Sequence, residues 1–216
     1  MIEVIFSIIG IIVLIISVIL HEYAHGRLSF AFGDSTPKDE GRLTLNPIKH
    51  LDPVGSLLLP LFLIILNSGF IIGWAKPVPI NPNNYQNKKL QWTIVALAGP
   101  LTNYLISFIS FLIIISLNSL PMSNSVILLK IIIWYFFAIN FVLASFNLIP
   151  LPPLDGFWLV YNLLPEVIQD KISVVLDQRY IPLMIILTAT VAVLISKYTI
   201  LPAINFFFDL LKIANI

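Results

Sequence analysis

Residues 14–33, LIISVILHEYAHGRLSFAFG, place His21, Glu22 and His25 at the end of an apolar run that starts at Met1. Ionisable side chains are costly at membrane depth and are rare in spanning segments. On a helix, positions i and i+4 share a face, so both imidazoles can reach one ion while the carboxylate projects beside it. The stretch therefore predicts a membrane helix that carries part of a metal site.

The composition of the whole chain predicts a polytopic membrane protein. Of its 216 residues, 58% are hydrophobic and 11% are charged, with a mean hydropathy of +0.97. A soluble domain carries about 25% charged residues. A net charge of +1 without long Lys or Arg runs argues against a nucleic-acid partner and leaves membrane lipid as the surroundings. The absence of cysteine excludes disulfides and thiolate metal ligands.

The apolar runs predict an all-α fold with about four to five transmembrane helices. They cover residues 2–32, 91–118, 126–148, 181–196 and 199–211. Residues 51–74 are apolar but broken by Pro and Gly, and GRLTLN and KPVPIN predict short extended segments near the metal site. We expect one integral membrane domain over residues 1–216, with a core at 1–165 and a C-terminal helical region at 166–216.

Catalytic zinc commonly takes three protein ligands and leaves one position for water. Asp155 is a candidate third ligand because it follows PLPPL at the end of a membrane helix. Irregular backbone at that depth is tolerated only where protein or a cavity buries it. Glu166 is another downstream carboxylate, in the loop-like LLPEVIQ, and for His50 a loop or gating role is favoured over ligation.

The combination of HEYAH in an apolar helix with NLIPLPPLDG (147–156) resembles the site-2 protease family of intramembrane zinc metalloproteases, in its compact subgroup without a PDZ domain. The segments TLNPIKHLDPVGSLLLP, GWAKPVPINP and ALAGPLTN extend this resemblance over roughly residues 10–160. The resemblance implies that His21, His25 and Asp155 hold one Zn²⁺ and that Glu22 is the general base. It also implies that Asn147 helps to bind substrate or to steady the oxyanion.

The resemblance further implies regulated intramembrane proteolysis, with transmembrane proteins or peptides as substrates. Two alternatives stay open. One is a non-proteolytic metal-binding membrane protein or transporter, and the other is a Ste24/HtpX-like membrane zinc protease with Glu166 as the third ligand. For Asn103 in GPLTN, helix packing and a role at the site are equally favoured. The two extended pieces could pair with an unwound substrate as an added strand.

Topology follows from the need for the two ligand groups to meet at one depth. If 51–74, 91–118 and 126–148 all crossed the bilayer, Asp155 would emerge on the wrong face, so we expect 51–74 to fold back as a re-entrant hairpin. That topology puts ten of the twelve Lys and Arg residues on one face if both C-terminal runs cross. The bias predicts that the site opens toward the cytoplasm. We expect a multi-pass protein of a bacterial or archaeal cell membrane.

Overall fold

The computed structural model describes residues 2–58, 62, 65, 75–175 and 180–213, and this part of the chain is helical without strands. The long elements are α1 (Ile2–Ala31), α4 (Lys88–Leu117), α5 (Asn124–Asn147) and a C-terminal rod formed by α8 (Ile181–Ile195), η5 (Ser196–Ile200) and α9 (Leu201–Ile213). The short elements are α2 (Thr36–Asp39), η1 (Pro47–His50), η2 (Pro53–Leu58), η3 (Pro82–Asn84), α6 (Asp155–Leu163) and α7 (Glu166–Val175). The all-α prediction is confirmed.

Four helical segments in the described residues are long and apolar enough to cross a membrane. Each covers 22 to 30 residues, against the roughly 20 that a bilayer core requires. α4 and α5 begin at side-chain caps, because Asn87 accepts the Leu90 N–H and Ser123 accepts the Val126 N–H. The polar residues that interrupt the apolar sequence thus mark the ends of the spans.

Polar side chains gather inside this bundle, and apolar side chains face outward. Ser17, Asn103 and Asn140 have no exposed surface, whereas Ile11, Leu105 and other large apolar residues of the spans are about half exposed. A soluble protein would bury such apolar residues. The distribution is therefore that of an integral multi-pass membrane protein with lipid around its apolar faces.

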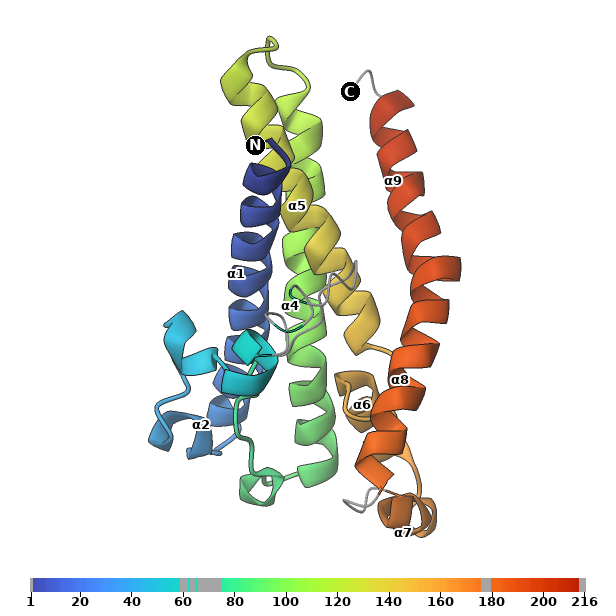
Figure 1. Ribbon diagram of the computed structural model, residues 1–216. Coiled ribbons are helices and arrows are strands. Elements are labelled where there is room, and N and C mark those ends of the chain that lie inside the picture. Colours follow the sequence, from blue (N-terminus) through green and yellow to red (C-terminus); the bar gives the residue numbers. More distant parts are fainter. Residues whose placement is uncertain (1, 59–61, 63–64, 66–74, 176–179, 214–216) are drawn as a thin grey trace.

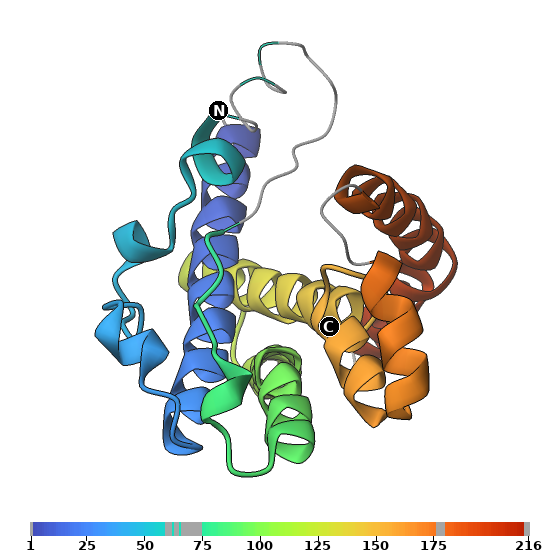
Figure 2. The same cartoon turned by 90° about the horizontal axis from the view of Figure 1, so that it is seen from below.

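The ends of α1 and α4 confirm the predicted parity. α1 runs from one end of the bundle to the other, and α4 starts at the end that α1 reaches (Figure 1). The chain between them therefore makes no net crossing. Pro53–Leu58 of the predicted hairpin form a π-helix, and most of the remainder of 51–74 lies outside the described residues. α5 slants from the side of α1 toward the C-terminal rod (Figures 1 and 2).

The two extended pieces have different outcomes. Residues 75–81 are extended, as predicted, and lie against α1 beside the candidate site. The strand-like reading of GRLTLN is wrong, because residues 42 and 43 close a turn after α2 through N–H bonds to the Pro37 carbonyl. Pro37 lies within that short helix, and its local turn satisfies these N–H groups without a partner strand.

The two C-terminal runs, whose separate crossing the sequence left open, follow one another as α8, η5 and α9, and Ile186–Phe207 form one segment long and apolar enough to cross a membrane. The end of α9, the helix that contains Lys212, therefore lies opposite to α7, the helix that contains Lys171 (Figure 1). The basic bias is retained with one C-terminal span, because it rests mainly on the connection between α1 and α4. The rod packs through Phe207 against Phe111 and Phe137.

Candidate metal centre

Three predicted ligand atoms converge near the C-terminal end of α1. The Nε2 atoms of His21 and His25 lie 3.1 Å apart. Asp155, the first residue of α6, places Oδ2 3.0 Å from Nε2 of His21 and 3.3 Å from Nε2 of His25. In the described part of the chain, these are the residues whose His, Asp or Glu ligand atoms cluster in this way.

The spacing of these atoms suits a zinc ion. Zinc binds His nitrogen and carboxylate oxygen at about 2.0–2.2 Å, and tetrahedral ligands at that radius lie about 3.4 Å from each other. The three separations of 3.0 to 3.3 Å are close to that value. Oδ2 of Asp155 is buried without a regular hydrogen bond, and its close neighbours are the two Nε2 atoms. This donor set fits zinc and leaves one tetrahedral position for water.

The other ring nitrogen of each histidine is held by α4. Nδ1 of His25 donates to the Val95 carbonyl at 2.7 Å, and Nδ1 of His21 lies 2.9 Å from Oδ1 of Asn103. Metal-binding histidines usually bond the outer nitrogen in this way, which fixes the ring and its tautomer. Asn103, for which packing and a role at the site were equally favoured, thus contacts one of the predicted ligands. The Val95 carbonyl has no sequence signal, because any residue could supply it.

Gly99 lets α4 approach the two imidazoles. A Cβ atom on this residue would overlap Nε2 of His25 and would lie 2.5 Å from Nε2 of His21. Any other amino acid would therefore push α4 away from the rings or displace them. The glycine of ALAGPLTN is therefore required because the backbone of α4 approaches the rings closely.

The turn that carries Asp155 packs tightly on itself. α5 ends at Asn147, and a Cβ atom on Gly156 would overlap the Leu148 carbonyl. This packing returns the chain toward α4, against which α6 packs. Thr188 of the C-terminal rod donates its hydroxyl to the Pro152 carbonyl and fastens the turn from the other side. The glycine of the LDG motif is therefore a packing requirement for the position of Asp155.

Glu22 faces the extended segment beside α1. Its Oε2 accepts the Val78 N–H at 2.8 Å, so the carboxylate stands next to the converging atoms without being one of them. Val78 is buried against Gly26, where an added Cβ would lie 2.9 Å from Cγ1 of Val78. The sequence placed Glu22 beside the histidines but gave no sign of this backbone donor.

The remaining candidates contribute no atom to the three-atom cluster. Nδ2 of Asn147 donates to the Leu143 carbonyl one turn earlier. His50 is buried, with Nε2 donating to the Thr44 carbonyl, and its own carbonyl accepts the Lys76 N–H. These contacts suit a loop role for His50 rather than ligation. Glu166 is exposed at the start of α7, outside the cluster that the Ste24/HtpX-like alternative would need it to join.

The extended segment offers little to a pairing strand. Pro77 and Pro79 have no N–H, and the N–H groups of Lys76, Val78 and Asn81 are bonded within the chain. Arg42 also occupies the Lys76 and Pro77 carbonyls. Strand addition depends on free main-chain donors and acceptors, so this edge is poorly suited to it.

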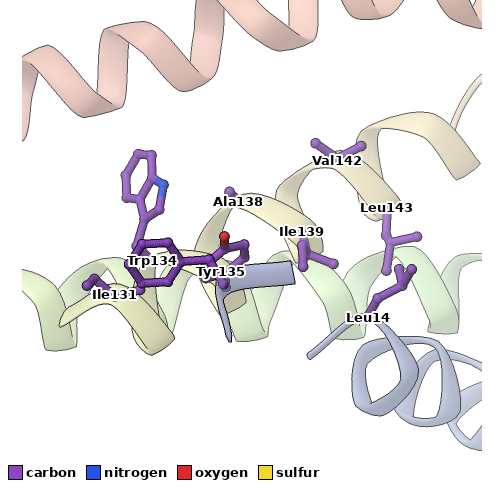
Figure 3. Close-up of a pocket in the computed structure, with 9 residues that line it drawn as sticks. Leu14, Ile131, Trp134, Tyr135, Ala138, Ile139, Val142 and Leu143 are labelled. Carbon is purple, nitrogen blue, oxygen red and sulfur yellow. The ribbon is translucent and has the colours of Figure 1, made fainter. Parts of the chain in front are cut away.

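A large apolar groove lies away from this centre. It measures about 640 Å³ and runs between α1 and α5 (Figure 3). Leu14 and Leu143 meet at one end of it, and Trp134 and Ile131 lie toward the other (Figure 3). The groove contains none of the predicted site residues, so the site is defined by its polar atoms rather than by this cavity.

The fold and the polar centre together define a membrane protein with a metal-binding site near the C-terminal end of its first membrane helix. The family model for peptidase family M50 matches residues 122–191. "Putative zinc metalloprotease YwhC" of Bacillus subtilis is 35% identical over 198 residues, covering 90% of this chain and 85% of that protein. The chain therefore belongs to peptidase family M50, the site-2 protease family, and is a membrane zinc metalloprotease.

Two further relatives share a name, "Putative zinc metalloprotease Rip2". The protein of Mycolicibacterium smegmatis is 30% identical over 70% of this chain and 57% of its own length. That of Mycobacterium tuberculosis is 28% identical over 66% and 52%, respectively. No solved structure matches the chain.

Proposed function

We propose that the chain is an intramembrane endopeptidase that cleaves transmembrane segments of other proteins. In this proposal His21, His25 and Asp155 hold one zinc ion, Glu22 is the general base, and Asn147 contacts the substrate or its oxyanion. The observation that carries it is the convergence of Oδ2 of Asp155 with the two imidazole nitrogens of a helix whose candidate membrane span covers residues 5–31. Such an arrangement at membrane depth would be costly without an ion.

When bound, zinc polarises a peptide carbonyl and lowers the pKa of a water molecule toward 7. Glu22 is placed to accept the proton of the attacking water, because it follows His21 directly and projects beside the ligand pair. It can then return that proton to the leaving amine as the peptide bond breaks. The Val78 N–H orients the carboxylate and leaves its second oxygen for this exchange.

The location of the centre also supports the substrate class. A helix hides its carbonyls in its own hydrogen bonds, so a transmembrane substrate must unwind locally before water can attack it. Membrane-anchored regulators and remnant signal peptides are substrates of this kind. The bonded N–H groups of Lys76, Val78 and Asn81 favour recognition by side chains such as Asn147 over strand pairing.

We further propose that the centre opens toward the cytoplasm of a bacterial or archaeal cell. Seven Lys and Arg residues fall between positions 27 and 89, in or beside the connection that joins α1 to α4. Positive residues accumulate in short cytoplasmic loops. This places the N-terminus of α1 and the connection between α4 and α5 outside.

Replacing Glu22 with Gln tests the reaction directly. The purified protein in lipid vesicles, loaded with zinc, should keep its metal and lose cleavage of a co-reconstituted transmembrane peptide by about 100-fold or more. Glu40→Gln is the matched control, because Glu40 is exposed after α2 and should keep full activity. Full cleavage by Glu22→Gln would exclude the proposed base. Zinc binding by the wild type without any cleavage would favour the non-proteolytic alternative.

A further inference from the structure

Hydrogen bonds behind His21 continue beyond Asn103 into the bundle. Nδ2 of Asn103, on α4, donates to Oδ1 of Asn140 on α5 at 3.1 Å. Nδ2 of Asn140 donates to Oγ of Ser17 on α1 at 2.8 Å and to the Phe136 carbonyl at 2.8 Å. Ser17, Asn103 and Asn140 are all fully buried. The chain of bonds thus connects the three central helices to one imidazole.

The direction of this chain is fixed at its far end. The Phe136 carbonyl can only accept a hydrogen bond. The Ser17 hydroxyl has one hydrogen, which it donates to the Val13 carbonyl at 2.8 Å, so its oxygen can only accept from Asn140. Both neighbours of the Asn140 amide nitrogen are therefore acceptors. This requires the Asn140 nitrogen to face them and its oxygen to face Asn103.

The orientation of Asn140 determines the orientation of Asn103 and the tautomer of His21. Since Asn140 presents an oxygen, Asn103 must present its amide nitrogen to it and turn its own oxygen toward His21. An amide oxygen can only accept, so Nδ1 of His21 must carry the proton. Nε2 of His21 is then directed toward His25 and Asp155. Orientations of amides and imidazoles are often ambiguous, but here two backbone carbonyls decide them.

We infer that Ser17 and Asn140 are positioning residues that set the tautomer of His21 and keep its Nε2 available for the metal. They act through Asn103 and do not touch the ion themselves. The inference rests on the proposed ligand set, and it explains why an asparagine lies among the apolar residues in the middle of a membrane helix. Loss of such an outer partner typically lowers metal affinity by about 10- to 100-fold.

The first test is the tautomer itself. The chain has three histidines, so ¹⁵N-histidine labelling gives six ring-nitrogen signals, which His50→Gln and His25→Gln variants assign. In metal-free and in zinc-loaded protein, Nδ1 of His21 should carry a proton. An unprotonated Nδ1 would overturn the inference. The metal-free measurement holds even if the wild type binds no zinc, an outcome that would instead reject the proposed function.

The second test is zinc affinity, measured by competition with a chelator. Asn140→Leu should raise the zinc dissociation constant by about 10- to 100-fold. Ser17→Ala should raise it by a smaller factor, because the Phe136 carbonyl still anchors Asn140. Ser110→Ala is the matched control, since this buried serine bonds the Ile106 carbonyl one turn back, outside the chain of bonds, and should leave affinity unchanged.

A purely structural role predicts a different result. Asn140→Leu and Ser17→Ala would then lower the thermal unfolding midpoint of the metal-free protein and leave both the zinc dissociation constant and the His21 signals unchanged. That outcome would overturn the inference. If Asn140→Leu does not fold, the His21 signals of the wild type and the comparison of Ser17→Ala with Ser110→Ala still decide it.

Discussion

The backbone of Gly99 packs directly against the imidazole ring of His25, and no space for a side chain remains between α4 and Nε2 of that ring. This contact places the wall of the metal centre on a helix that contributes no ligand atom. The position of the zinc ligands thus depends on how closely α4 packs against α1. Small residues at helix contacts allow such close packing in membranes.

The contact predicts that Gly99→Ala disrupts the centre. The added methyl group must displace the rings of His21 and His25 or the backbone of α4, so zinc affinity should fall by more than about 10-fold. Chelator competition measures this fall. Gly10→Ala is the control, since its Cβ would meet only the Tyr135 ring, at 3.2 Å, and should leave zinc affinity unchanged. Equal affinities in all three proteins would contradict the described packing.

Replacement by alanine should have opposite effects on zinc content at Asp155 and at Glu166. Asp155→Ala removes an oxygen that lies 3.0 Å and 3.3 Å from the two imidazoles, so the purified protein should lose its zinc. Glu166→Ala should keep one zinc per chain, because this side chain is exposed at the start of α7. Metal analysis of both variants decides the matter. The reverse pattern would restore the Ste24/HtpX-like alternative.

Asp34 predicts a pH-dependent contribution to stability. The carboxylate is fully buried after α1 and accepts five hydrogen bonds, from Ser29, Thr36, Asn81 and Asn84. Burial alone would raise the pKa of Asp34, but these bonds, led by that of the Thr36 hydroxyl, lower it below its ordinary value of 3.8. The stabilisation is therefore complete above that value and is lost as the pH falls through the lower pKa of the folded state.

Asp34→Asn should lower the stability at pH 7 by about 1–3 kcal/mol, because an amide nitrogen cannot accept from the backbone donors. It should also weaken the loss of stability below about pH 4. Thermal unfolding in detergent micelles across this range measures both effects. Asp170→Asn, at an exposed position in α7, should match the wild type. A variant as stable as the wild type at pH 7 would contradict the role of the five bonds.

The proposed orientation predicts opposite accessibility at the two ends of the bundle. The chain has no cysteine, so Met122→Cys in the connection between α4 and α5 and Glu40→Cys after α2 each give one reactive thiol. A membrane-impermeant maleimide should label Met122→Cys in intact cells and Glu40→Cys only after lysis. The unmodified protein is the unlabelled control. Labelling of Glu40→Cys alone in intact cells would reverse the orientation.

The sequence was sufficient for the spans α1, α4 and α5 and for the parity, and its resemblance to the site-2 protease family grouped Asp155 with His21 and His25. Apolar runs and the four-residue histidine spacing are local patterns, and the parity follows from the requirement that the ligands meet. The contributions of Ser17 and Asn140 were not predicted, although a polar residue inside an apolar helix is a signal. Their pairing depends on the rotation of three helices about their axes, which no local pattern determines.

Two other differences have local causes. The alternation in GRLTLN matches a strand, but the turn after α2 captures its N–H groups. The sequence separates two C-terminal apolar runs, but the chain continues between them as η5, which joins α8 to α9. The structure that such a short pattern adopts depends on which hydrogen-bond partner its backbone groups find nearby.

The bond between Val78 and Glu22 also fixes the register of the segment that carries it. Val78 lies between Pro77 and Pro79, so a slip of one residue in either direction would bring a nitrogen without hydrogen to the carboxylate. No neighbouring donor can take over, and the buried Val78 side chain against Gly26 opposes a longer shift. The alternation of proline and valine therefore allows only one backbone nitrogen, that of Val78, to bond the Glu22 carboxylate in this register.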